Sequence, residues 1–274
     1  MTTTLRPTGP LQQSTDGAKS RTYDVCVNSR PVGRIQLGTR GAAGPRVAEI
    51  LDLRIDEPDR GRGRATVAAL AAEEVLRGWG CTRIEAAVPA TAPGALHLAT
   101  ALGYVERNRN MAKQLPLRPP ALPDGARARA MTRDEYVVWV ARAKEEYAKE
   151  SIQRGVPEAE ARAKAERDYD RLLPDGIATP GARLSVLLHD GDQVGALWLA
   201  ERDDDAYVYD IETMEPFRGR GHGRTLMLFA EAQALAAGKT RIGLNVFAGN
   251  TPALRLYESL GYEPVTHYVY KQLL

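Results

Sequence analysis

An internal repeat dominates the sequence. When the chain is displaced by 158 positions, residues 50–115 align without a gap against residues 208–273, and 25 of the 66 pairs are identical. The identities run through loops as well as through regular elements, as where Leu102-Gly103-Tyr104 meets Leu260-Gly261-Tyr262. Chance similarity between helices would lose this register at the first loop. The chain therefore contains two copies of one folding unit.

A proline-rich segment separates the two copies. Residues 118–125 read RPPALPDG, a composition that suits neither a helix nor a central strand. We expect an N-terminal domain over residues 23–117, a linker over residues 118–128 and a C-terminal domain over residues 129–274. The residues before position 23 are polar and lack the apolar core of a secretion signal, so we expect a disordered leader there.

Composition narrows the class of protein. The chain is 43% hydrophobic and 26% charged, and its 37 basic and 35 acidic residues leave a formal charge of +2. This balance gives no reason to expect a nucleic-acid partner, and no apolar run approaches the ~20 residues that cross a bilayer. Cys26 and Cys81 lack the spacing of metal ligands, so we expect buried free thiols and no metal site. We expect a soluble cytoplasmic protein without a membrane partner.

Each copy is predicted to be an α/β unit with the order strand, glycine loop, helix, strand, helix, strand. The second copy adds a hairpin over residues 184–199 and, before it, two charged helices at residues 133–153 and 157–172. The first copy has a counterpart of the hairpin over residues 22–37 but only the polar leader in place of the helices. The core elements expected in the second copy are strands at 206–214, 241–247 and 266–274 and helices at 224–237 and 250–260.

The glycine loop is the repeated feature with chemical meaning. It reads RGRGHG at residues 218–223 and RGRGRA at residues 60–65. A strand that leads through glycines into a helix leaves free amide groups at the positive end of the helix dipole, which suits an anion such as a phosphate. The Lys-Ser/Thr of a P-loop and the glycine spacing of a dinucleotide fold are both absent. By itself the loop is equally consistent with a solvated turn or a nucleic-acid contact.

A second motif extends this pattern. The loop pattern Arg218-x-x-Gly221-x-Gly223 is followed by Asn250-x-x-Ala253-x-x-Leu256-Tyr257-x-x-x-Gly261-Tyr262. Together they resemble the GCN5-related N-acetyltransferase (GNAT) superfamily, and the whole chain resembles a tandem GNAT protein. The resemblance implies two domains, each a mixed, largely antiparallel sheet with a splayed parallel strand pair flanked by helices.

The resemblance also implies acetyl-CoA as the cofactor. The amides of the loop would hold the pyrophosphate, the main chain at the end of the preceding strand would bind the pantetheine arm, and the helix asparagine would face that arm. The residues implied in coenzyme binding are Thr213, Met214, Arg218, Gly219, Arg220, Gly221, His222, Gly223, Arg224, Thr225, Asn250 and Tyr257. The matching loop of the first copy, made of Arg60, Gly61, Arg62, Gly63, Arg64 and Ala65, is a second candidate.

Acetyl transfer to an amine needs a base for the amine and a proton donor for the leaving sulfur. The resemblance places the Tyr257 hydroxyl near the sulfur, which makes it the candidate acid. Asp210 and Glu212 share one face of a strand, and we expect Glu212 to be the base because of its reach, while Asp210 could be structural. Many members of the family carry a glutamate at the position of Asn245, which here could hold a water. His222 is expected beside the phosphate; His189 and His267 are expected to be structural.

The two copies are unequal in these residues. Ala92, Ala99 and Arg54 replace Asn250, Tyr257 and Glu212 in the first copy. We therefore predict catalysis in the C-terminal domain, with a primary amine of a small molecule or a peptide N-terminus as acceptor. A non-catalytic acyl-CoA-binding or interaction protein is the alternative. The acceptor, the acyl-chain preference and the oligomeric state are left open by the sequence.

Overall fold

The computed structural model describes residues 2–40, 47–153 and 156–273. It divides into two compact units. The first unit holds the chain up to Met111 together with residues 246–251 and 264–274, and the second unit holds residues 112–245 and 252–263. The sequence repeat and the compact unit are thus different divisions of the chain.

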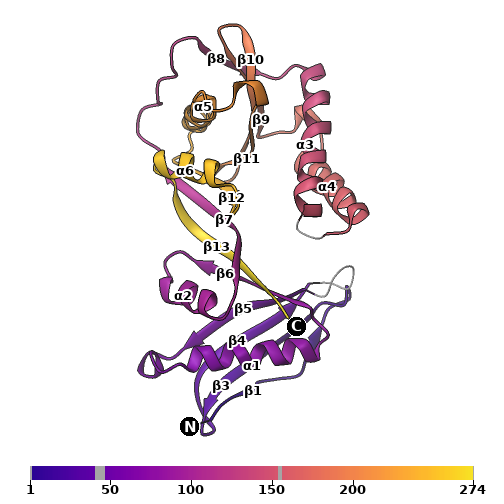
Figure 1. The fold of residues 1–274 in the computed structure, drawn as a ribbon, viewed down its shortest axis with the longest axis vertical. Coiled ribbons are helices and arrows are strands. Elements are labelled where there is room, and N and C mark those ends of the chain that lie inside the picture. The colour runs from indigo at the N-terminus through magenta and orange to yellow at the C-terminus, as the bar shows by residue number, and fades with distance from the viewer. Residues whose placement is uncertain (1, 41–46, 154–155, 274) are drawn as a thin grey trace. The chain divides into compact units, whose positions relative to one another are not determined.

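The first unit is a sheet with the strand order β1-β3-β4-β5-β6-β13, and β2 pairs with β3 at one side. Figure 1 shows the long helix α1 lying along β3, β4 and β5. The elements of this unit are β1 Thr3–Pro7, β2 Gln12–Gln13, β3 Lys19–Val27, β4 Arg30–Thr39, β5 Val47–Ile55, the 3-10 turn Glu57–Asp59, α1 Arg64–Gly78, β6 Arg83–Pro89, α2 Pro93–Ala101, most of β7 Val105–Gln114, and β13 Glu263–Gln272.

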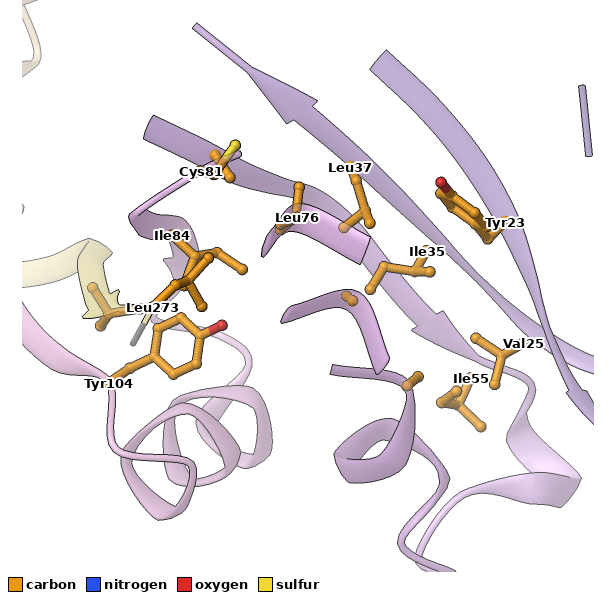
Figure 2. Close-up of a cluster of buried hydrophobic side chains, with 14 of the residues drawn as sticks. Tyr23, Val25, Ile35, Leu37, Ile55, Leu76, Cys81, Ile84, Tyr104 and Leu273 are labelled. Atoms are coloured by element: carbon orange, nitrogen blue, oxygen red, sulfur yellow. The ribbon is translucent and has the colours of Figure 1, made fainter. Parts of the chain in front are cut away.

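Helical spacing explains how α1 is held on this sheet. Ala68, Ala72 and Leu76 recur every four residues and are all fully buried, so one face of the helix is apolar. They pack against Ile35 and Ile84 in a single core cluster, part of which Figure 2 shows. Small alanines let the helix approach the sheet closely.

The second unit has the strand order β12-β11-β10-β9-β8. Successive residues of a strand point to opposite faces of its sheet. Gly195 on β10 faces α5, and the next residue, Ala196, packs with Trp139 of α3. Helices therefore cover both faces of this sheet (Figure 1). The elements of this unit are β8 Ala126–Ala130, α3 Arg133–Gln153, α4 Glu158–Leu172, the 3-10 turns Gly176–Ala178 and Glu215–Phe217, β9 Ala182–His189, β10 Asp192–Glu201, β11 Asp205–Thr213, α5 His222–Ala236, most of β12 Arg241–Phe247 and most of α6 Thr251–Ser259.

The two repeats exchange their last strands. β13, from the second repeat, pairs antiparallel with β6 of the first unit from Thr266–Pro89 to Gln272–Arg83. The pairing ends where the Leu273 amide donates to the Thr82 carbonyl at 2.8 Å. In the second unit, the end of β7 from the first repeat lies beside β12, and the Leu115 amide donates to the Thr240 carbonyl, also at 2.8 Å. Each unit is therefore completed by the other repeat.

Matched ion pairs fix this exchange. Lys271 lies 2.8 Å from the buried carboxylate of Glu73 in the first unit, and Lys113 lies 2.8 Å from that of Glu231 in the second. All four residues correspond under the displacement of 158, but each lysine pairs with the glutamate of the other repeat. Because both glutamates are almost fully buried, each needs its lysine to remain charged at low cost.

A repeated β-bulge opens each sheet at the same place. β5 and β6 pair in parallel over Val47–Ile50, and β11 and β12 pair over Asp205–Val208. The next residue of each first strand, Leu51 or Tyr209, is skipped in the pairing with the antiparallel neighbour on the other side. A bulge bends its strand, and the parallel pairing stops there. The predicted α/β fold with two mixed sheets and splayed parallel pairs is confirmed.

Two segments differ from the sequence prediction. The leader expected to be disordered forms β1, which pairs with β3 from Thr3–Val27 to Pro7–Tyr23, and its Leu5 packs against the core. One inward apolar residue in a short polar strand gives too weak a pattern to recognise. Residues 126–128, expected in the linker, begin the edge strand β8. Cys26 and Cys81 are buried thiols that form no disulfide, as expected. Among the described residues, no helix has the length and apolarity needed to span a membrane.

Candidate functional site

The loop before α5 has the conformation of an anion site. Gly219 and Gly221 adopt φ values of 77° and 86°, in the left-handed region that glycine favours, and Gly221 caps the helix without a side-chain hydrogen bond. Within the described residues, the amides from Gly219 to Arg224 make no hydrogen bond to protein atoms. A run of unsatisfied donors at a helix N-terminus is well suited to a phosphate.

The loop also leaves room for such a ligand. A Cβ atom added at Gly219 or Gly221 would meet nothing within 4 Å, whereas at Gly223 it would come within 3.2 Å of Leu256 on α6. The first two glycines therefore serve the turn, and the third allows α5 and α6 to pack closely. Arg224 strengthens this contact by donating to the Ser259 hydroxyl at 2.5 Å. Thr225, one residue further along α5, is buried.

Charged and aromatic side chains surround the loop. The Arg218 Nε donates to the Thr213 carbonyl at 3.3 Å, and the Arg220 guanidinium lies 5.7 Å from the Phe217 ring centre. His222 is buried at the start of α5, and its ring centre lies 5.0 Å from that of His189. Burial, His189 and Arg220 all lower the pKa of His222, so this imidazole stays neutral at neutral pH.

The last residues of β11 present an open edge beside the loop. The Met214 amide donates to the Val194 carbonyl, and the Met214 carbonyl accepts from Phe217, each at 2.9 Å. Both main-chain groups of Met214 are therefore engaged within the protein. Because hydrogen-bonding directions alternate along a strand, the main-chain groups of Thr213 point away from β10 toward the open side. The Thr213 carbonyl accepts from Arg218, so the Thr213 amide is the better main-chain partner for an extended ligand.

Asp210 and Tyr257 come together next to this edge. The Trp139 indole on α3 donates to the Asp210 carboxylate at 3.1 Å. Desolvation raises the pKa of Asp210 to about 6, helped by the charge of Glu212. Tyr257 on α6 is only 5% exposed, and burial, together with the negative charge of Asp210, raises its pKa to about 12. The site thus combines a carboxylate of unusual basicity with a phenol that stays protonated.

Glu212 has a different environment from Asp210. Its carboxylate forms an ion pair with Arg142 of α3 at 2.5 Å. Both side chains remain partly exposed. The Arg142 guanidinium is already a partner of this carboxylate, so Glu212 is less available to a substrate amine than Asp210 is. The preference for Glu212 as the base is thus not favoured by its surroundings.

A cavity of about 340 Å³ lies next to these carboxylates, between α3 and the strands β9 and β10. Its apolar wall consists of Met131, Val138, Trp139, Val186, Ala196 and Met214. Its polar lining consists of Asp134, Glu135, Arg142 and Gln193. Trp139 and Arg142 line the cavity and also contact Asp210 and Glu212, so the cavity opens toward the candidate catalytic groups.

The first unit keeps the loop but not these groups. Gly61 and Gly63 have φ values of 70° and 71°, and the Arg60 Nε donates to the Ile55 carbonyl at 2.8 Å. Arg64, in place of His222, pairs instead with the buried Asp59. The positions of Tyr257 and Glu212 hold alanine and arginine, and the helices α3 and α4 belong only to the second unit. The two loops share a backbone conformation but not a chemical setting.

The sequence located some of these residues and missed others. Asn250 lies directly before α6, and Asn245 is an exposed residue of β12. The sequence did not identify three residues as part of the site: Trp139, Arg142 and His189. Trp139 and Arg142 contact β11 from 70 or more residues away in the sequence, and His189 contacts His222 of the loop. No local motif marks such contacts. His267 lies 2.6 Å from Glu106 in the first unit. No cluster of metal-ligating side chains occurs in the part of the chain that the structure describes.

Comparison with known proteins agrees with this geometry. The model of the acetyltransferase (GNAT) family matches twice, over residues 4–104 and 141–262. The chain belongs to the GNAT family. It is 30% identical over 150 residues to the uncharacterized N-acetyltransferase YycN of Bacillus subtilis. The aligned region covers 52% of this chain and 96% of YycN. It is 33% identical over 90 residues to a mycothiol acetyltransferase of Corynebacterium glutamicum, covering 32% of this chain and 31% of that protein.

Solved structures show the same fold over almost the whole chain. A GCN5-related N-acetyltransferase from Sphaerobacter thermophilus superimposes with a TM-score of 0.57 at 16% identity and covers 92% of this chain and 80% of its own. A tandem GNAT protein from the clavulanic acid biosynthesis pathway has a TM-score of 0.50 at 20% identity, covering 96% and 85%. The GNAT chain is accordingly an acyltransferase that transfers acetyl groups, built from two GNAT repeats; proteins of this family generally use acetyl-CoA.

Proposed function

We propose that this GNAT protein is an acetyl-CoA-dependent N-acetyltransferase that acts on a primary amine and that the second repeat carries the chemistry. One observation supports this most: Asp210 and Tyr257 lie together beside an open strand edge in the same unit as a loop of unsatisfied amides. Acetyl-CoA would supply an acetyl thioester, whose carbon accepts a neutral amine and whose sulfur leaves as a thiolate.

The loop and the strand edge fit the coenzyme. The amides from Gly219 to Arg224 would hold its pyrophosphate, and the side chains of Arg218 and Arg220 would add positive charge at the loop surface. The outward main-chain amide of Thr213 would bind the pantetheine arm. Asn250, directly before α6, is a further polar candidate. His222 would lie beside the phosphates as a neutral imidazole.

Asp210 is the proposed base. An alkyl ammonium has an ordinary pKa near ~10.4 and must lose a proton before it can attack. A carboxylate with a pKa of about 6 is a better acceptor than an ordinary one, because its basicity lies closer to that of the amine. Trp139 would hold the carboxylate in position. Glu212, bound to Arg142, would contribute negative charge that favours the approach of an ammonium group.

Tyr257 is the proposed partner of the leaving sulfur. Its pKa of about 12 keeps the phenol protonated throughout the physiological range. An ordinary thiol has a pKa near ~8.5, well below that of Tyr257, so complete transfer of the phenolic proton to the thiolate would be uphill. We therefore assign Tyr257 a hydrogen bond to the departing sulfur, which stabilises the charge as it forms.

The substitution Tyr257→Phe tests this function. It removes one hydroxyl and keeps the ring, so the affinity for CoA measured by calorimetry should stay within about two-fold, while kcat for an amine acceptor falls by about 10- to 1000-fold. If wild-type protein binds CoA but acetylates no member of a broad amine panel, the alternative of a non-catalytic acyl-CoA-binding protein is favoured. Unchanged kcat in the variant would remove Tyr257 from the mechanism.

A further inference from the structure

The cavity beside α3 carries a specific arrangement of charge. Glu135 does not contribute a free charge, because Arg129 binds it in a bidentate pair at 2.7 and 2.8 Å and the Thr132 amide donates to it at 2.8 Å. These contacts hold the pKa of Glu135 at about 2. Both carboxylate oxygens of Glu135 are therefore engaged within the protein, whereas Glu212 meets Arg142 through Oε2.

Asp134 also lines the cavity, but it is an exposed residue in the first turn of α3. The charges next to β11 form one opposed pair. Arg142 lines the cavity and lies 2.5 Å from Glu212, whose strand also carries Asp210. At this position a positive and a negative group stand side by side at the boundary between an apolar cavity and the reacting end of β11. Both are partly exposed, with 38% and 29% of their side-chain surface accessible, so both can reach a ligand.

We propose that the acceptor is a free α-amino acid with an apolar side chain. Its carboxylate would bind the Arg142 guanidinium, its amino group would face Glu212 and Asp210, and its side chain would occupy the wall formed by Met131, Trp139 and Val186. This inference rests on the proposed function and names the substrate class of that same site. The size agrees, because a cavity of about 340 Å³ is near the lower limit for small-molecule sites.

Other amine classes fit this charge pattern less well. A polyamine would bring a second cation toward Arg142, and like charges at close range oppose binding. A peptide N-terminus has an amide instead of a carboxylate next to its amine, so Arg142 would gain no anionic partner. In an α-amino acid the ammonium and carboxylate groups are both attached to the α-carbon. The two groups are therefore close enough to meet Glu212 and Arg142, which are themselves in contact.

The reaction balances with the groups present. The acceptor ammonium passes one proton to the Asp210 carboxylate, its nitrogen forms a bond to the acetyl carbon, and the carbon–sulfur bond breaks. The nitrogen then loses a second proton, and the sulfur leaves as a thiolate that takes up a proton in CoA. The products are an N-acetyl amino acid, CoA and one proton released to solvent through Asp210.

The test compares each amino acid with the same molecule lacking its carboxylate charge. L-Methionine, L-phenylalanine and L-leucine are measured against 3-(methylthio)propylamine, phenethylamine, isopentylamine and L-methionine amide, with the full chain and acetyl-CoA. Since a hydrogen bond to a charged group contributes about 1.5–3 kcal/mol, kcat/KM should be about 10- to 100-fold higher for the amino acids. In Arg142→Gln this ratio should fall toward one, whereas Arg133→Gln, an exposed arginine of the same helix that does not line the cavity, should retain it.

The possible results distinguish a failure of the amino-acid assignment from a failure of the proposed acetyltransferase function. Turnover of the amines or the amide at least equal to that of the amino acids would overturn the amino-acid assignment while leaving the acetyltransferase function intact. Absence of turnover with every acceptor, despite CoA binding, would overturn both. A direct measurement serves as a second readout: calorimetric binding of L-phenylalanine to the protein–CoA complex should be detectable in wild type and at least about 10-fold weaker in Arg142→Gln.

Discussion

At the scale of single residues, the surroundings of a carboxylate decide its role more than its position along the strand. Asp210 and Glu212 differ by two residues and point to the same face, yet one is desolvated beside the Trp139 indole and the other is paired with Arg142. The same α3 helix supplies both contacts. These surroundings favour the shorter side chain as the proposed base, which reach alone does not predict.

The substitution Asp210→Asn tests this assignment through pH. For the wild type, kcat/KM should rise with pH through about 6 and then level off, since the base works only when deprotonated. The variant should lose this step and about 100-fold or more in rate, because general base catalysis contributes about 10²- to 10⁴-fold. A wild-type profile without a step near pH 6, or an unchanged step in the variant, would exclude Asp210.

The same variant has an independent effect on stability. The folded-state pKa of Asp210 lies above its ordinary value of 3.8, so ionisation destabilises the fold as pH rises from about 4 to about 6. The asparagine side chain cannot ionise, and the Asp210→Asn variant should therefore unfold with about 1–2 kcal/mol more free energy at pH 8. The difference should disappear near pH 3.5, where Asp210 of the wild type is largely protonated in both states. Chemical unfolding at the two pH values measures it.

At the scale of elements, the sequence predicted the order of helices and strands because their signals are local. Gly238 and Gly261 end helices, and the apolar spacing of α1 and the β-branched run of β11 identify those elements without tertiary information. The bulges at Leu51 and Tyr209 and the strand β1 could not be predicted, since they depend on pairing with distant strands.

The exchanged strands give a testable energetic consequence. In Lys113→Met the carboxylate of Glu231, which is 1% exposed, loses its lysine, and removal of one partner of a buried pair costs about 3–5 kcal/mol. The double variant Lys113→Met/Glu231→Gln should recover a large part of that loss because it buries no unpaired charge. Hydrogen exchange of α5 and β12 reports on the second unit separately. Strict additivity of the two single substitutions would contradict the pairing.

At the scale of the whole molecule, the strand exchange means that the repeats visible in the sequence are not self-contained. The first unit needs Leu273, a residue of the second repeat, in its core beside Ile84 and Tyr104 (Figure 2). The repeat itself was evident from sequence, but the exchange was not, because the lysines and glutamates involved are identical in both copies and satisfy either pairing equally well. Only the three-dimensional pairing distinguishes the two arrangements.

The proposed division of labour between the repeats can be tested within one molecule, because the loop occurs in both repeats and each loop serves as the control for the other. Gly221 and Gly63 both adopt left-handed conformations with open space around a Cβ position. Asparagine and aspartate tolerate this conformation to a similar degree, so an Asp variant compared with its Asn counterpart isolates the effect of negative charge on a bound pyrophosphate.

The decisive measurement is kcat/KM for acetyl-CoA in Gly221→Asp and Gly221→Asn and in Gly63→Asp and Gly63→Asn. A charge placed against a pyrophosphate at close range should lower this value by about 10- to 100-fold in Gly221→Asp relative to Gly221→Asn. The corresponding pair at position 63 should differ by less than about two-fold. A large loss at position 63 with none at position 221 would show that the first repeat holds the reacting coenzyme and would contradict the account.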